Sequence, residues 1–172
     1  RDNRNSLFAT SNYAVFNTLD KGITKHPLRY YQKEALYILD YLYNESICEI
    51  ARVDKAIRTK YRQLVERLVD IVDEDELVKA PFIGYEMATG SGKTMLMGAA
   101  IYLLNQKYDV KNFLIVTPPS TDIYQKTIRN FATGNFESVW ADDTPFRFNL
   151  ITGDNYTQNL FFNEDVDANI FI

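Results

Sequence analysis

Five residues near the middle of the chain have the types and the spacing needed to hold a phosphate. Gly-Ser-Gly-Lys-Thr occupies positions 90–94, between an apolar segment and a run of helical character. The two glycines let the backbone bend so that its N–H groups point at phosphate oxygens, and the helix that follows adds its partial positive charge. Lys93 would reach the β- and γ-phosphates, and the Thr94 hydroxyl would coordinate Mg²⁺. The predicted nucleotide-binding residues of this glycine loop (residues 88–94) are Thr89, Gly90, Ser91, Gly92, Lys93 and Thr94.

The residue before the glycine loop narrows the class of protein. The strict phosphate-loop pattern has glycine where this chain has Met87. Two glycines before the lysine are typical of the motor variant of this motif, and they disfavour small GTPases and nucleotide kinases. A glycine turn without a ligand is the alternative, and the correct strand and helix context on both sides argues against it.

Strands and helices are predicted to alternate around the glycine loop. The segment 113–117 has the near-continuous apolar character of a strand in a parallel sheet, and two prolines stop it. Ser120 or Thr121 is placed to cap the following helix. This order predicts an α/β fold in which a parallel sheet is flanked by helices. The predicted strands are 82–87, 113–117, 148–152 and 169–172, and the predicted helices are 93–104 and 120–131, with a loop at 105–111.

The residues before position 81 divide into three predicted parts. Residues 1–27 are polar and irregular, and they form an N-terminal extension. Residues 28–43 have apolar positions at helical spacing after Pro27, which predicts a leader helix. Residues 44–80 form a helical insertion with one long apolar stripe, either packed on its own domain or docking a partner subunit. Residues 81–172 are then the first part of the main lobe.

Composition and charge indicate the broad class of protein but do not determine its function. The 172 residues are 46% hydrophobic and 24% charged, as in an ordinary globular domain, and the longest apolar run is too short to span a membrane. The single cysteine, Cys48, fits a reducing cytoplasm. The net charge of −4 is uneven: residues 137–172 hold one Lys/Arg against seven Asp/Glu, whereas residues 81–136 hold five against three. Nucleic acid therefore remains a possible partner.

Three segments together resemble the superfamily-two helicases. Leu-Arg-Tyr-Tyr-Gln at 28–32 is similar to their glutamine-containing leader, the glycine loop to their first motif, and residues 113–118 to the strand with a proline loop that comes next. The combination is most similar to the ATPase (Res) subunit of type III restriction enzymes. The resemblance implies a RecA-like P-loop lobe, binding of ATP and Mg²⁺, and translocation on DNA, with a methyltransferase or specificity subunit as a possible partner.

The resemblance also implies roles for residues outside the glycine loop. Gln32 would read adenine, since an amide offers both a donor and an acceptor to the N6 and N7 edge. Tyr31 or Tyr30 would stack on the base. The turn after the second strand would hold a nucleic-acid backbone phosphate through hydroxyls and N–H groups. The predicted nucleic-acid-binding residues are Pro118, Ser120 and Thr121, with Lys126 and Arg129 adding charge nearby.

An acidic strand-end motif for Mg²⁺ is not found within these 172 residues. Asp142 and Asp143 are expected in a solvated loop, and Asp165 and Asp167 precede the last strand instead of following it. We therefore expect residues 1–172 to be the incomplete N-terminal part of an ATP-dependent helicase or translocase, active only within the whole protein. The alternatives are a nucleotide-dependent protein-binding scaffold that does not use nucleic acid, and an inactive remnant.

Overall fold

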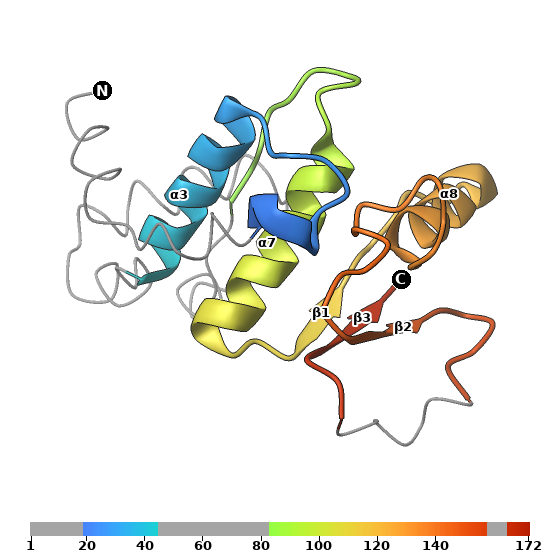
Figure 1. The fold of residues 1–172 in the computed structure, drawn as a ribbon. Helices are drawn as coiled ribbons and strands as arrows, with labels where there is room; N and C mark the ends of the chain where they lie inside the picture. Colours follow the sequence, from blue (N-terminus) through green and yellow to red (C-terminus); the bar gives the residue numbers. More distant parts are fainter. Residues whose placement is uncertain (1–18, 45–82, 158–164) are drawn as a thin grey trace, which may run out of the picture. The chain divides into compact units, whose positions relative to one another are not determined.

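A computed structural model describes residues 19–44, 83–157 and 165–172 of the chain (Figure 1). The chain divides into two compact units. One comprises residues 1–11 and 37–87, and the other comprises residues 12–36 and 88–172. Almost all of the predicted insertion at 44–80 lies outside the described residues. The second unit contains the glycine loop, the sheet and the first turns of the leader helix.

In the described residues, three α-helices correspond to the predicted leader helix and to the predicted helices at 93–104 and 120–131. They are α3 (Tyr30–Asn44), α7 (Lys93–Tyr108) and α8 (Thr121–Phe131). Helix α7 continues four residues beyond its predicted end, so the predicted loop at 105–111 is wrong for residues 105–108. Asn105 does not break the helix, because its side-chain amide donates to the carbonyls of Val110 and Asp167 at 2.9 and 2.6 Å. The helix ends at Asp109, which adopts a left-handed conformation with φ of 55°.

A parallel sheet of three strands follows α7 in the chain. The strands are β1 (Asn112–Leu114), β2 (Phe148–Ile151) and β3 (Ala168–Phe171), in the order β1-β3-β2, and both pairs are parallel. The predicted α/β class with parallel pairing is therefore confirmed. An asparagine from each strand lies at the same register position, and the side chain of Asn169 bonds to those of Asn112 and Asn149 at 3.0 and 2.9 Å.

Two strand predictions need correction. The described residues 83–88 form no regular secondary structure, and the side chains of Tyr85 and Glu86 are exposed. An apolar composition predicts burial, but a strand also needs a partner that completes its hydrogen-bond ladder. Strand β1 is shorter than the predicted 113–117, and Leu114 and Val116 are 74% and 82% exposed. Phe113 is half-buried between the exposed Asn112 and Leu114, so this strand is not buried on both faces.

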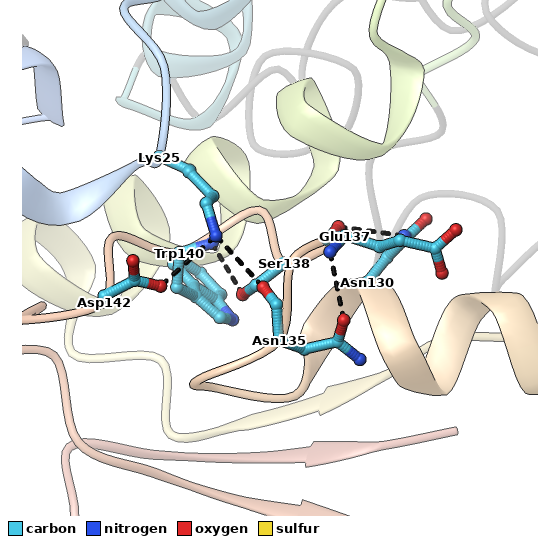
Figure 2. Close-up of polar contacts among 7 residues, drawn as sticks. All are labelled: Lys25, Asn130, Asn135, Glu137, Ser138, Trp140 and Asp142. Atoms are coloured by element: carbon cyan, nitrogen blue, oxygen red, sulfur yellow. Dashed lines mark hydrogen bonds and ion pairs between the residues drawn. The ribbon is translucent and has the colours of Figure 1, made fainter.

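The described end of the predicted N-terminal extension is part of the second unit's core. A short π-helix, η1 (Leu19–Ile23), precedes an antiparallel bridge between Thr24 and Trp140. Lys25 then reaches across, and its ammonium bonds to the Asn135 carbonyl and the Asp142 carboxylate at 3.1 and 3.2 Å (Figure 2). Residues 19–27 are therefore not an irregular extension. Their burial comes from Leu19 and Ile23, which are almost fully enclosed.

An aromatic cluster forms the centre of the second unit. The Trp140 ring is fully buried and lies 5.2–6.2 Å, between ring centroids, from three phenylalanine rings. Tyr102 of α7 makes an edge-on contact with one of the three, Phe146, at 5.4 Å. The cluster therefore ties α7, the end of α8 and the start of β2 together. The phenylalanines around Trp140 are Phe131, Phe146 and Phe148.

Candidate nucleotide-binding site

The glycine loop has the backbone conformation that its sequence predicts. Gly90 and Gly92 have φ values of 76° and 82°, in the left-handed region that residues with a side chain rarely adopt. Between them, the Ser91 N–H and hydroxyl both donate to the Ala88 carbonyl, at 3.3 and 2.6 Å. The loop is therefore a tight turn whose shape is set by glycine and by its own hydrogen bonds.

Lys93 and Thr94 open helix α7 directly after this turn. Gly92 is the N-cap, and the N–H groups of the first helical turn have no partner within the helix, which leaves donors for an anion. The exposed Lys93 side chain folds back across the loop, and its ammonium donates to the Ala88 carbonyl at 2.9 Å. An exposed cation and oriented backbone donors thus lie together at one helix N-terminus.

The leader helix α3 contacts the glycine loop directly. The Gln32 side chain is 3% exposed, so it is not an ordinary surface residue of the helix. Its Nε2 donates to the carbonyls of Ser91 and Gly92 at 3.3 and 3.0 Å, and its Oε1 accepts from the Arg29 N–H at 2.8 Å. The Tyr31 hydroxyl donates to the Ser91 carbonyl at 2.7 Å. The structure therefore brings two predicted base-contacting residues onto the loop backbone, a contact that spacing along the sequence does not reveal.

Gly92 is required for space as well as for conformation. A Cβ atom built on this residue would lie 2.6 Å from Nε2 of Gln32. Any side chain at position 92 would therefore displace the amide that holds the loop. By contrast, a Cβ at Gly90 would meet nothing within 4 Å, so that position needs glycine for its positive φ alone.

The chemistry of the described residues fits a nucleotide phosphate chain. Backbone donors, the Lys93 ammonium and the Thr94 hydroxyl suit phosphate oxygens and their Mg²⁺ ion. The Tyr85 side chain, three residues before the loop, is 38% exposed, and burial of the rest of the phenol raises its pKa to about 12. Within residues 19–44, 83–157 and 165–172, no three His, Cys, Asp or Glu side chains gather as a metal site. The role of Thr94 as a Mg²⁺ ligand stays a prediction.

The predicted nucleic-acid contact lies at the start of helix α8. Ser120 is the N-cap, but its side chain makes no capping hydrogen bond, which corrects the expected cap. Pro118 and Thr121 are exposed at the same turn. The negative charge of Asp122, in the first helical turn, disfavours an anion at this position. Arg129 is paired with Glu137 at 2.7 Å. The role of Pro118, Ser120 and Thr121 in binding nucleic acid stays a prediction.

Comparison with known families identifies the class of protein. The family described as type III restriction enzyme, res subunit, matches residues 25–172. The chain therefore belongs to this family, whose members share a helicase-like ATPase domain. The parallel sheet and its helices are compatible with the RecA-like lobe that the family implies. No curated protein and no solved structure matches the chain. In the part of the chain that the structure describes, no helix is long and apolar enough to cross a membrane.

Proposed function

We propose that this chain is the ATP-binding part of an ATP-dependent DNA helicase or translocase of a type III restriction enzyme or a related phage-defence enzyme. The observation that carries the proposal is the glycine loop itself. Gly90 and Gly92 have left-handed backbone conformations, and Lys93 and Thr94 follow them at a helix N-terminus. Gln32 of the leader helix donates a hydrogen bond to the loop backbone. Membership of the res subunit family supports the proposal that ATP hydrolysis at this site drives a helicase or translocase.

In this proposal each residue of the loop has a separate task. The N–H groups of the loop and of the first turn of α7 bind the phosphates, and the Lys93 ammonium neutralises charge on the β- and γ-phosphates. Thr94 holds Mg²⁺, which supplies further neutralisation of the phosphate oxygens when it is bound. In this proposal Gln32 and Tyr31 contact the base, and Gln32 exchanges its present bonds to the Arg29 N–H and the loop carbonyls for bonds to the adenine edge.

DNA is the proposed substrate of the motor, with a methyltransferase or specificity subunit as its proposed partner. The turn at Pro118, Ser120 and Thr121 would hold one backbone phosphate, because exposed hydroxyls and helix N-terminal N–H groups suit that ligand. Family membership is the support for both proposals.

The test of the proposed function is DNA-stimulated ATP hydrolysis by the full-length protein. We expect duplex DNA to raise the rate of phosphate release several-fold, because a translocase couples hydrolysis to its track. ATP binding without stimulation by either duplex DNA or RNA would favour the nucleotide-dependent scaffold. Failure to bind ATP at all would contradict the proposed site itself.

Gln32→Ala tests the proposed reading of adenine. A site built to pair hydrogen bonds penalises the wrong base, because its polar groups are left unpaired. We expect the ratio of ATP to GTP affinity to fall by about tenfold in the variant, measured by competition binding. The variant also loses the bonds to the Ser91 and Gly92 carbonyls, which would lower the affinity for both nucleotides alike. The ratio of the ATP affinity to the GTP affinity therefore reports base recognition alone.

A matched control for this variant is Gln106→Ala. Gln106 is an exposed glutamine of α7 whose side chain bonds only to the neighbouring Asn105 among the described residues, at 2.8 Å. Its removal should leave the ratio unchanged. Equal affinity of the unmodified protein for ATP and GTP would remove the basis for assigning adenine recognition to Gln32.

A further inference from the structure

Two neighbouring carbonyl groups of the glycine loop are held by side chains of the leader helix. The Ser91 carbonyl accepts from the Tyr31 hydroxyl at 2.7 Å and from Gln32 Nε2 at 3.3 Å. The Gly92 carbonyl accepts from Gln32 Nε2 and from the Leu96 N–H, both at 3.0 Å. Each carbonyl therefore has two partners: both partners of the Ser91 carbonyl come from α3, and the Gly92 carbonyl has one partner in α3 and one in α7.

The direction of these carbonyls fixes the direction of two N–H groups. In a trans peptide the C=O and the following N–H point in opposite directions, and all described peptide bonds are trans. The peptide that begins with the Ser91 carbonyl carries the Gly92 N–H, and the next one carries the Lys93 N–H. With both carbonyls turned toward Tyr31 and Gln32, both N–H groups point away from the leader helix. They belong to the turn that would surround a phosphate.

Resting on the nucleotide site proposed above, we infer that Tyr31 is a positioning residue whose hydroxyl orients the Ser91–Gly92 peptide for phosphate binding. Left-handed glycines rotate easily, so these peptides need an external partner to stay in one orientation. Gln32 holds both carbonyls, but its bond to Ser91 is long. The short bond from Tyr31 is therefore the principal external restraint on that peptide.

A neighbouring arginine strengthens the bond from Tyr31. The Arg29 Nη1 donates to the Tyr31 oxygen at 3.1 Å, so this oxygen accepts from a cation while its own proton is donated to Ser91. A hydroxyl polarised in this way is a better donor. The chain of bonds from Arg29 through Tyr31 to Ser91 gives the hydroxyl a task that stacking on a base does not require.

Tyr31→Phe separates these two roles, because it removes the hydroxyl and keeps the ring. We expect affinities for ATP, GTP and inorganic tripolyphosphate, each with Mg²⁺, to fall by the same factor of about 3 to 10, as for the loss of one hydrogen bond. The ligands are titrated calorimetrically into the full-length protein. The thermal unfolding temperature should not change, because Tyr31 is 39% exposed. Tyr156→Phe, at a tyrosine that is 58% exposed and whose hydroxyl makes no hydrogen bond among the described residues, is the control and should match the unmodified protein.

The outcomes distinguish this inference from the proposed function. Unchanged affinities in Tyr31→Phe, with binding lost in Lys93→Ala, would overturn the positioning role and leave the nucleotide site intact. A loss for ATP and GTP but not for tripolyphosphate would also overturn it, because that pattern indicates a contact with the base. Unchanged affinities in both variants would show that the glycine loop is not the binding site.

Discussion

Lys93→Ala is expected to lower DNA-stimulated ATP hydrolysis by the full-length protein about 100- to 1000-fold, as for removal of a preorganised charge-stabilising donor. ATP affinity should fall about 10- to 100-fold, because hydrogen bonds between charged groups are the strong ones. The ammonium already lies over the loop, 2.9 Å from the Ala88 carbonyl, and it is free to turn to a phosphate oxygen. Steady-state phosphate release and equilibrium binding measure the two effects.

The same substitution should leave folding unchanged, since the Lys93 side chain is exposed. Lys111→Ala is the matched control: it removes the same charge from an exposed ion pair with Asp109, at the far end of α7. Surface ion pairs of this kind contribute little to stability. The ATP affinity and hydrolysis rate of Lys111→Ala should therefore equal those of the unmodified protein. A fall of equal size in both variants would mean that net charge matters and that Lys93 has no specific role.

Local signals explain why much of the site could be predicted. The left-handed conformation at Gly90 and Gly92 follows from residue type, and the start of α7 at Lys93 follows from the change of period after the turn. The position of β1 follows from the apolar segment that includes Phe113 and Leu114. Each of these features depends on a few consecutive residues, which is the information that a sequence carries most directly.

Features that depend on distant contacts were not predictable in the same way. The bond between Tyr31 and the Ser91 carbonyl joins residues 60 positions apart, and no periodic pattern marks it. Likewise, Leu19 and Ile23 lie in a polar segment, but the bridge from Thr24 to Trp140 brings them into the core. The predicted strand at 82–87 fails for the opposite reason, because apolar residues alone do not supply a pairing partner.

Trp140 links the segment just before the leader helix to the rest of the second unit. Its backbone pairs with Thr24, and its ring nitrogen donates to the Phe131 carbonyl at 3.1 Å. Helix α7 passes so close that a Cβ at Gly98 would lie 3.6 Å from the indole and 2.9 Å from Val139. Figure 2 shows the same loop held from outside by Lys25 and by Asn130. The indole therefore fills the space between α7, the end of α8 and the start of β2.

Trp140→Ala is expected to destabilise the protein by about 3 to 5 kcal/mol, as for other buried aromatic residues replaced with alanine. The cavity would adjoin Phe146 and Phe148, and the buried Phe131 carbonyl would lose its donor. Chemical denaturation followed by circular dichroism measures the change, and Trp140→Phe, with a smaller loss of about 1 to 2 kcal/mol, serves if the alanine variant does not fold.

Phe136→Ala is the control for this last prediction, because it removes an aromatic ring four residues away that is 92% exposed. Its loop is fixed independently of the ring, by bonds from Lys25 to the Asn135 carbonyl and from Asn130 to the Glu137 carbonyl. We expect a change within about 0.5 kcal/mol. If Trp140→Ala were equally mild, the indole would not be the centre of the core, and η1 would be held in place by its own buried residues, Leu19 and Ile23, instead.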